Sequence, residues 1–594
     1  MKKALIFLLA VLLSTTTFAQ QKDPLPKLAG FDQFMNQTLK DWNAPGVGVG
    51  IVVKGKLVFV KGYGYRDYDK KMPITGNTLF QIASNSKLFT AVAIGMEVEK
   101  GKLEWDKPVK KFVPAIEFYN DELNNTVTMR DMLSHRTGIS RHDLFWYKSE
   151  FTRKQLFDKL RYLEPSQPLR QGFLYNNLMY TAAGYSLELL TGNTWEDYLK
   201  ANILHPLDMK STVFTIADMK KSSDYFTPYA EKRDTNILYQ IPWYEEQGGV
   251  GPAGAVISNI NDMSHWLIAL MNEGKYNGKQ VIPSAVLQAT LQPSIPTGNS
   301  LTERYKESQN AVYGMGRWVS SYRGHLYTEH GGALNGIYSQ VSFMPQDSIG
   351  VIVFAIGDHC RPLIEIVNFN VYERLLDLDL TPWSERNLKD YLEIKKMTRE
   401  GRQKAVAGRI AGTKPSHPMD DYVGEYEHPG YGIIKITKRG QGMQFALNKI
   451  EMPLSHFHYD RFDTPNDEQL GLFSLNFSTN PQGDIGGLTV SLDEKEAEFK
   501  RRPDASLSDP KTLETYTGQY EVATGYVLTI VLKNNELIVT APDAPDEHLI
   551  PYKPRVFKAQ KFSDMTIEFV MENGKVTGFK QKDPSGEYVI KRKE

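Results

Sequence analysis

Residues 82–90 read IASNSKLFT and place a serine and a lysine three positions apart at the predicted start of a helix. Apolar residues then recur at helical spacing as far as Met96, and Gly101 follows as a stop signal. An i, i+3 pair puts Ser84 and Lys87 on one helix face, beside backbone N–H groups that favour a developing negative charge. The pattern predicts a nucleophilic Ser84 with Lys87 as its base. A lysine fills that role only if its pKa lies well below about 10.4.

A Ser-x-x-Lys pair is weak evidence when it stands alone. Ser508 and Lys511 show the same spacing, and Pro510 between them indicates a plain loop. Taken alone, Ser84 and Lys87 could equally mark the first turn of an ordinary helix. Other residues must therefore support the catalytic interpretation.

Two further motifs carry groups suited to the same chemistry. Tyr175 and Asn177 precede a predicted helix; the phenol can shuttle protons, and the amide can orient a substrate or the lysine. His330 is followed by Gly331 and Gly332 at the entry of a predicted strand. The glycines allow a substrate backbone to lie close to the strand, and the histidine adds a polar or cationic group. Each of these residues on its own could also be a packed core residue.

The order of the three motifs resembles the serine β-lactamase and penicillin-binding protein superfamily. The chain is most similar to the branch that holds class C β-lactamases, D-Ala-D-Ala carboxypeptidases, D-aminopeptidases and related esterases. Three more segments agree with that branch and occur in the same order. They are TMRDMLSHRTGIS (128–140), GPAGAVISNINDMSHW (251–266) and YGMGRW (313–318). The resemblance covers about residues 30–380.

The resemblance implies an α+β fold, in which helices flank an antiparallel sheet and a helical region completes the cleft. It implies that Ser84 forms an acyl-enzyme and that Lys87 and Tyr175 share the proton transfers. Asn177 would hold the substrate amide and the lysine, and His330 would polarise the site and shape the substrate pocket. Substrate binding and the oxyanion hole would use Gly332 and Ala333, with the backbone N–H groups of Ser84 and Ala333 as donors.

The chain departs from most β-lactamases of this branch at one motif. They carry Lys-Thr-Gly where this sequence has His330-Gly331-Gly332. A lysine is a fixed cation suited to a β-lactam carboxylate, whereas a histidine is often neutral near pH 7. The sequence therefore favours an amidase, peptidase or esterase acting on D-amino-acid peptides, peptidoglycan-like peptides or esters. The alternatives are a β-lactamase and a penicillin-binding sensor that acylates without efficient turnover.

The N-terminus predicts export from the cytoplasm. Residues 1–19 combine two lysines, an apolar run and small residues before Gln20, which is typical of a cleavable signal peptide. The expected location is the periplasm or the exterior, with no membrane span after cleavage. Only one cysteine is present, so no internal disulfide can form. Lysine plus arginine and aspartate plus glutamate both total 70, which argues against a nucleic-acid partner.

Composition and repeats divide the rest of the chain. The hydrolase domain is expected over 20–383, and the charged, helix-favouring stretch 384–416 with its prolines is expected to be a linker. DYVGEYE at 421–427 and TYTGQYE at 515–521 begin two similar strand-rich segments. They predict two small all-β modules, barrel- or sandwich-like, over 417–505 and 506–594, although one larger β domain is also possible.

The function of the β modules stays open. They could cap the cleft, contact a cell-wall polymer or act as spacers. The weakest overall alternative is an adhesin in which these modules do the work. For the hydrolase domain the expected partner is a small-molecule or peptide substrate. No cofactor is expected, and no His/Cys/Asp group has the spacing of metal ligands.

Overall fold

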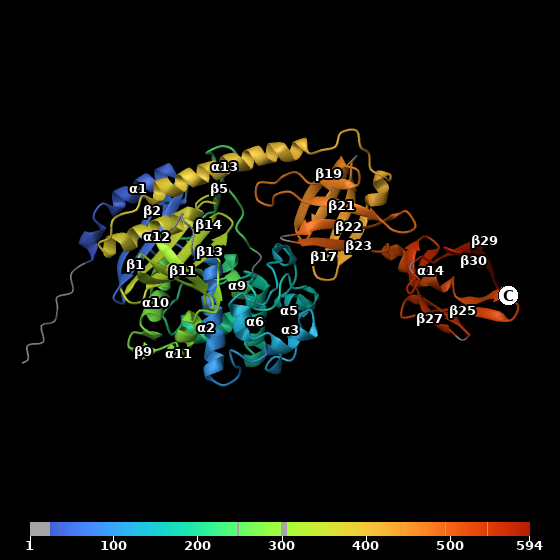
Figure 1. Cartoon of the computed structure of the whole chain (residues 1–594), viewed down its shortest axis with the longest axis horizontal. Coiled ribbons are helices and arrows are strands. Elements are labelled where there is room, and N and C mark those ends of the chain that lie inside the picture. Colours follow the sequence, from blue (N-terminus) through green and yellow to red (C-terminus); the bar gives the residue numbers. More distant parts are fainter. Residues whose placement is uncertain are drawn as a thin grey trace, which may run out of the picture.

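The computed structural model describes residues 24–245, 249–298, 306–440, 442–492, 495–542, 544–562 and 564–593. The predicted signal peptide over 1–19 lies outside these ranges. Within them, no helix combines the length and the apolar character that a membrane crossing requires. Figure 1 shows three parts in chain order: an α+β domain, a first barrel and a second barrel.

A nine-stranded antiparallel sheet forms the centre of the first domain, in the order β10-β11-β12-β13-β14-β15-β1-β2-β3. β1 and β2 form an antiparallel hairpin that turns at Gly55. The sheet comprises β1 (Gly46–Val53), β2 (Lys56–Asp67), β3 (Met72–Pro73), β10 (Ile295–Pro296), β11 (Ser308–Tyr313), β12 (Trp318–Tyr322), β13 (His325–Leu334), β14 (Ile337–Met344) and β15 (Ile349–Ile356).

Glycines in β1 set how closely a helix packs on the sheet. A Cβ at Gly50 would lie 2.5 Å from Cγ2 of Ile260, the first residue of α10 (Ile260–Met271). The bare backbone lets α10 press directly against β1, because any side chain at Gly50 would push the helix away. β1 is therefore an inner strand of the sheet, with its residues in the cores on both faces.

Helices cover the two faces of this sheet. On one face, α1 (Phe31–Asp41) and α12 (Arg361–Leu375) share a core with β1 and β15. On the other face, α2 (Ser86–Glu99) and α10 belong to a larger core that extends into the helical region. That region contains α3 (Asp121–Thr126), α4 (Met129–Leu133), α5 (Arg153–Asp158), α6 (Asn177–Thr191), α7 (Trp195–Leu199), α8 (Ile216–Met219), α9 (Gly251–Gly254) and α11 (Ser284–Leu291). Short strand pairs are β4 (Phe80–Gln81) with β7 (Ile257–Ser258), β5 (Tyr229–Glu231) with β6 (Leu238–Gln240), and β8 (Lys275–Tyr276) with β9 (Lys279–Gln280).

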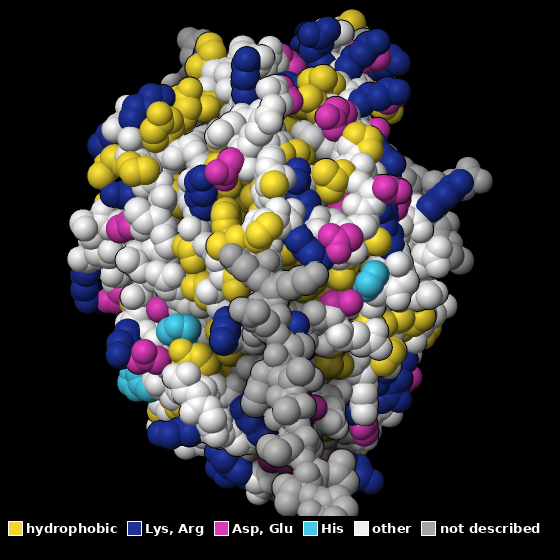
Figure 2. Space-filling view, turned by 90° about the vertical axis from the view of Figure 1, so that its left-hand side faces the viewer, with side chains coloured by type: hydrophobic (Ala, Val, Ile, Leu, Met, Phe, Trp, Pro, Cys, Tyr) yellow, Lys and Arg dark blue, Asp and Glu magenta, His cyan; other side chains and the backbone are white. Residues whose placement is uncertain are grey.

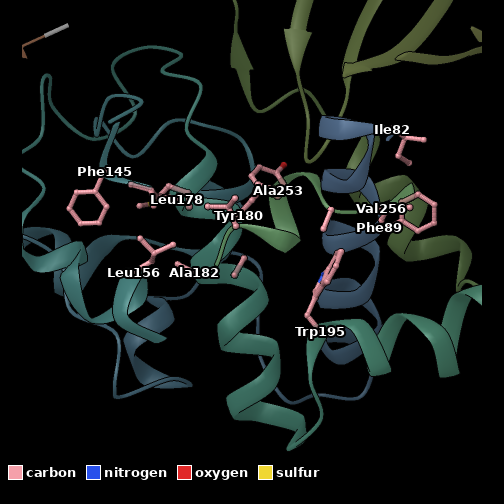
Figure 3. Packing of buried hydrophobic residues seen from close by; sticks show 14 of the residues in the cluster. Ile82, Phe89, Phe145, Leu156, Leu178, Tyr180, Ala182, Trp195, Ala253 and Val256 are labelled. Atoms are coloured by element: carbon pink, nitrogen blue, oxygen red, sulfur yellow. The ribbon is translucent and has the colours of Figure 1, made fainter. Parts of the chain in front are cut away.

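The helix that carries the Ser-x-x-Lys motif runs through this larger core. Figure 3 shows Phe89 of α2, Val256 and Trp195 gathered around it, with Tyr180 of α6 nearby. Phe89 stacks on Trp266 of α10 with ring centroids 3.9 Å apart. A catalytic group on α2 is therefore held on a rigid support, because the helix is enclosed by packed side chains.

The helix α13 (Trp383–Ala407) leads from the first domain to the barrels along the outer edge in Figure 1. Lys395 Nζ lies 2.9 Å from Glu231 and Arg402 Nη2 lies 2.9 Å from Asp234, so the helix is tied back to the domain it leaves. The charged stretch predicted as a linker is thus mostly a docked helix. Figure 2 shows basic and acidic side chains mixed over one face of the molecule, in keeping with the balanced charge.

The two predicted β modules are two closed eight-stranded barrels, so the alternative of one larger β domain is wrong. The first barrel consists of β16 (Gly424–His428), β17 (Gly432–Arg439), β18 (Gly442–Leu447), β19 (Ile450–His458), β20 (Arg461–Asp463), β21 (Ser474–Thr479), β22 (Ile485–Leu492) and β23 (Lys495–Arg501). The second, preceded by α14 (Pro510–Glu514), consists of β24 (Gly518–Ala523), β25 (Tyr526–Lys533), β26 (Glu536–Ala541), β27 (Ala544–Lys553), β28 (Val556–Ala559), β29 (Thr566–Glu572), β30 (Lys575–Asp583) and β31 (Gly586–Arg592).

The sequence echo between the barrels has a structural cause. The Tyr426 hydroxyl donates to the carbonyl of Tyr422 at 2.8 Å, and in the second barrel Tyr520 donates to Tyr516 at 2.7 Å. The repeated tyrosines therefore form the same buried hydrogen bond at the start of each barrel.

Candidate active site

Ser84 lies in the 3-10 turn Ala83–Asn85, which leads directly into α2. Its side chain is partly exposed, whereas its neighbours on both sides are buried. Ala83 has a φ of +49°, a left-handed conformation that is unfavourable for a residue with a Cβ. The surroundings fix this turn: the Ile82 N–H donates to Val256 O at 3.0 Å, and Ile82 O accepts from Ser339 Oγ at 2.7 Å.

Lys87, the second residue of α2, is completely buried. Its Nζ lies 3.0 Å from Ser84 Oγ, 2.7 Å from Asn177 Oδ1 and 2.9 Å from the carbonyl oxygen of Ala253. A neutral lysine amine has two hydrogens and one lone pair. Because Asn177 Oδ1 and the carbonyl oxygen of Ala253 can only accept, they take the two hydrogens and leave the lone pair facing Ser84 Oγ. This arrangement suits a base that removes the serine proton.

The surroundings also lower the proton affinity of this amine. Burial holds the pKa of Lys87 well below its usual value, and the positive charge of Arg141 lowers it further. The carboxylate of Asp143 acts in the opposite direction. Arg141 Nε and Asp143 Oδ2 lie 2.6 Å apart, so the two charges partly offset each other. The requirement stated from the sequence, a lysine with a depressed pKa, is therefore met mainly by burial.

Tyr175 lines the pocket next to the lysine, two residues before α6. Its ring centroid is 4.8 Å from Lys87 Nζ, and the ring lies parallel to that of Trp318 at 6.1 Å. Burial raises the pKa of Tyr175 above 10, against the opposing effect of a hydrogen bond with Ser84. The phenol therefore keeps its proton near neutral pH. Lys87, rather than Tyr175, is the group suited to act as the resting base.

Asn177, the first residue of α6, links the lysine to the wall of the pocket. Its Oδ1 accepts from Lys87, while its Nδ2 donates to Asp143 Oδ1 at 3.2 Å. The two bonds fix which end of the amide faces the lysine. Sequence analysis missed Asp143 and Arg141, which belong to no short motif. Only the proximity of RHD to the segment 128–140 could have pointed to them.

Gly332 and Ala333 of β13 line the pocket on the side of the serine turn. A Cβ at Gly332 would lie 2.2 Å from Ile82 O and 2.4 Å from Ser339 Oγ. Only a glycine therefore allows β13 to run this close to the turn that holds Ser84. The structure places both residues on the pocket wall beside the serine turn, and their role in an oxyanion hole stays a prediction.

His330 lies behind this wall and is not among the residues that line the pocket. Its Nε2 is 3.0 Å from the Tyr313 hydroxyl, and its ring centroid is 4.8 Å from that of Trp318. The side chain is 3% exposed, and burial lowers the pKa of His330 to about 3. His330 is thus a neutral group that packs behind the pocket against Tyr313 and Trp318. The cationic role that the sequence left open does not fit this position.

The pocket in front of Ser84 has a volume of about 820 Å³. Aromatic and charged side chains missed by the sequence analysis form much of its lining. Besides Tyr175, the aromatic set is Trp146, Tyr147, Phe173, Tyr244, Trp318 and Tyr338, and the charged set is Arg141, Asp143, Glu329, Arg361 and Glu365. Such a volume accommodates a substrate larger than a single amino acid.

The first barrel holds the segment 141–147, here called the pocket loop, which supplies four lining residues. The Tyr431 hydroxyl lies 2.7 Å from His142 Nδ1, and both residues are buried. Asn448 Nδ2 donates to the carbonyl oxygens of Leu144 and Tyr147, each at 3.0 Å. The first barrel therefore contacts the active site indirectly, through hydrogen bonds to the pocket loop.

We expect Tyr431→Phe to lower kcat/KM about fivefold, the effect of losing one hydrogen bond of about 1 kcal/mol. The change removes the hydroxyl that holds His142, so Arg141 and Asp143 next to it become less well positioned. Steady-state kinetics on the full chain would measure it, with thermal unfolding as the check on folding. Tyr526→Phe, at the start of β25 in the second barrel, is the matched control and should leave kcat/KM unchanged. Equal rates for Tyr431→Phe and the native enzyme would contradict the expectation.

The fold and the Ser84–Lys87–Tyr175 geometry define a serine hydrolase of the β-lactamase and penicillin-binding class. The chain belongs to the Beta-lactamase family, whose pattern it matches over residues 31–362. Residues 408–501 and 502–589 each match a domain of unknown function, DUF3471.

The chain is also similar to individual named proteins. The chain is 27% identical over 439 residues to an unguisins hydrolase of Aspergillus campestris, covering 70% of this chain and 78% of the relative. It is 26% identical over 357 residues to Protein flp of Staphylococcus aureus, covering 57% of this chain and 66% of the relative. Among solved structures, the octameric penicillin-binding protein homologue from Pyrococcus abyssi aligns with a TM-score of 0.53 and 19% identity. That alignment covers 80% of this chain and 100% of the other, and it indicates a shared fold.

Proposed function

We propose that this protein is an exported serine hydrolase that cleaves amide or ester bonds in D-amino-acid peptides, peptidoglycan-like peptides or esters. The observation that carries the proposal is the contact of 3.0 Å between Lys87 Nζ and Ser84 Oγ, made by an amine whose pKa is depressed. A serine with such a base attacks a carbonyl and retains the acyl group as an ester.

In the proposed acylation, Ser84 Oγ bonds to the substrate carbonyl carbon while its proton moves to Lys87 Nζ. The carbonyl oxygen becomes an oxyanion beside the backbone of Ser84 and Ala333. The bond to the leaving group then breaks. The leaving nitrogen or oxygen takes a proton from the Tyr175 hydroxyl, and Lys87 returns its proton to Tyr175. Water attacks the acyl-serine by the same steps in reverse, which releases the acid and restores Ser84.

The pocket supports an amide or ester substrate over a β-lactam. A β-lactam carboxylate is best met by a fixed cation at the position of His330, and this histidine is neutral and lies outside the pocket. The large aromatic lining suits a peptide with side chains of its own. The relative named unguisins hydrolase adds support for hydrolysis as the type of reaction.

The acyl-enzyme is tested by labelling with a fluorophosphonate or penicillin-type probe and weighing the intact protein. We expect one label per chain and none on Ser84→Ala. The matched control is Ser508→Ala, which removes the serine of the second Ser-x-x-Lys and should label like the native protein. Undiminished labelling of Ser84→Ala would refute the assignment.

A substrate panel then separates the classes of hydrolase. Release of product from D-amino-acid peptides or short-chain esters at many turnovers per enzyme supports the proposal. Preferential turnover of cephalosporins would support a β-lactamase instead. A single stoichiometric burst without later turnover would support a penicillin-binding sensor.

The proposal also includes export from the cytoplasm and contact with the cell wall. The support for export is the signal-peptide pattern over 1–19. Expression with the natural N-terminus should yield a mature chain that begins at Gln20 in the periplasm or the medium. Recovery of the full-length chain in the cytoplasm would contradict this. Binding of the purified protein to isolated envelope polymer, or its absence, would decide the cell-wall contact.

A further inference from the structure

The second barrel contains a cavity of about 210 Å³ at one end of its interior. Leu528, Val539, Ala541, Ala544, Pro545, Met565, Ile567 and Phe579 give it an apolar lining, and Glu547, Lys561, Phe562 and Gln581 complete it. Because the two barrels are repeats with the same strand order, the first barrel shows how side chains can fill the equivalent space.

Strand register identifies the equivalent residues in the first barrel. Ile436 of β17 pairs with Phe445, and its repeat partner Ile530 of β25 pairs with Val539. Val539 therefore occupies the position of Phe445. Two residues further along the same strands, Ala541 replaces Leu447 in the same way. Both substitutions exchange a large core side chain for a smaller one.

The opposite wall shows the same change. Leu475 of β21 pairs with Phe462 and Ile567 of β29 pairs with Phe557, so residues two positions earlier also correspond. They are Phe473 in the first barrel and Met565 in the second. Phe473 stacks on Phe445 with ring centroids 5.3 Å apart, and both rings are buried. In the second barrel this aromatic pair is replaced by Val539 and Met565, which both line the cavity.

Two further replacements introduce polar groups. Met452 faces Phe445 across β18 and β19, whereas Glu547 faces Val539. Val490 faces Leu475, whereas Gln581 faces Ile567. Glu547 Oε1 accepts from the backbone N–H of Lys561 at 2.7 Å, and Gln581 Nε2 donates to Asp583 Oδ2 at 2.9 Å, so each polar group is anchored within the barrel while its side chain lines the cavity. The pattern is that of a binding site, with an apolar body and a few polar groups.

We propose that the second barrel binds a small uncharged amphiphile in this cavity, with its apolar part inside and its polar end near Glu547 and Gln581. An apolar cavity of about 150 Å³ holds a benzene molecule, so a cavity of this size takes roughly eight to ten non-hydrogen atoms. One carboxylate and one ammonium, Glu547 and Lys561, contribute no net charge, which favours an uncharged ligand. Phe562, 61% exposed, offers apolar surface beside the cavity.

The probe for the test is n-octanol, measured by saturation-transfer difference NMR on the full chain. We expect saturable binding that is about 250-fold tighter than that of n-butanol, since each of the four additional buried methylenes improves affinity about fourfold. The double variant Val539→Phe with Met565→Phe restores the filling of the first barrel and should weaken octanol binding about tenfold or more. Val531→Phe adds the same ring to a 38% exposed position of β25 and should leave binding unchanged.

Each outcome decides the proposal. Binding of octanol to the double variant with native affinity would place the alcohol elsewhere, such as the pocket of Ser84, and would overturn the proposal. An absence of saturable binding to the native chain would overturn it too, because the cavity would then be an empty space. If the double variant fails to fold, Ala541→Leu replaces it, since leucine is the residue of the first barrel there. Substrate hydrolysis by all variants should stay at the native rate, which keeps this result separate from the proposed function.

Discussion

Replacing Lys87 with methionine is expected to slow acylation of Ser84 by about 10³-fold, within the range that a positioned base contributes. Methionine fills a similar volume but has no amine to take the serine proton. Loss of the Lys87 amine also leaves Asn177 Oδ1 and Ala253 O without the donor that Nζ provides. The rate constant for labelling by a fluorophosphonate probe measures the effect without requiring a known substrate.

Two further variants sharpen this result. Lys87→Arg should be as slow as methionine, because a guanidinium keeps its proton and cannot act as a base. Lys511→Met changes the lysine of the second Ser-x-x-Lys and should label at the native rate. Rapid labelling of Lys87→Arg would show that Lys87 acts only as a positive charge. The general base would then have to be Tyr175.

The pH dependence of the labelling rate should respond to the charges next to Lys87. Lys87 works as a base only when unprotonated, so the rate should rise with pH and level off above the pKa of Lys87. Arg141→Gln removes a positive charge that lowers this pKa, so the rise should move to higher pH. Asp143→Asn removes the opposing charge and should move it to lower pH. Shifts in the reverse directions, measured over a pH series, would contradict Lys87 as the titrating group.

The parts of the site that the sequence predicted are those held together by local structure. Ser84 and Lys87 share one helix start, and Tyr175 and Asn177 share another, so short motifs were enough to find them. Their meeting across 90 residues followed only from resemblance to a family. No periodicity in the sequence predicts that Asn177 Oδ1 will lie 2.7 Å from Lys87 Nζ.

The parts that the sequence could not predict depend on long-range packing. The carbonyl of Ala253 completes the contacts of Lys87 through α9, and a backbone carbonyl leaves no mark in the residue pattern. Tyr431 reaches His142 from a different domain, 289 residues away. The burial of His330 behind Trp318 is equally invisible, because a histidine in a strand has the same sequence pattern whether it faces the pocket or the core.

The barrels also have features that the sequence predicted and features that it could not predict. The repeated tyrosines made two modules predictable, because each copy forms its own local hydrogen bond. The sequence did not distinguish a barrel from a sandwich. A barrel closes only when the first and last strands pair, as β24 does with β31. The first barrel is filled and the second has a cavity because of differences at equivalent positions, such as Phe445 in the first and Val539 in the second. These look conservative until strand register aligns them.

The second large effect is expected at Gly332. Gly332→Ala places a Cβ 2.2 Å from Ile82 O, a contact that real structures do not tolerate. The carbonyl of Ile82 is held by Ser339 Oγ at 2.7 Å, so relief requires β13 to move away from the serine turn. That movement separates the backbone of Ala333 from that of Ser84, where the oxyanion forms. We expect acylation to slow about 10²-fold or more, the usual result of losing one oxyanion donor.

The neighbouring glycine provides the matched control. A Cβ at Gly331 meets Ser339 O at 3.7 Å and Ile364 Cδ1 at 3.8 Å, which are ordinary van der Waals contacts. Gly331→Ala should therefore label within about threefold of the native rate, since it adds the same methyl group without a clash. Thermal unfolding of both variants separates a displaced strand from a lost fold. Equal labelling rates for the two variants would mean that β13 does not supply the oxyanion donor, because only Gly332 faces the turn that carries the nucleophile.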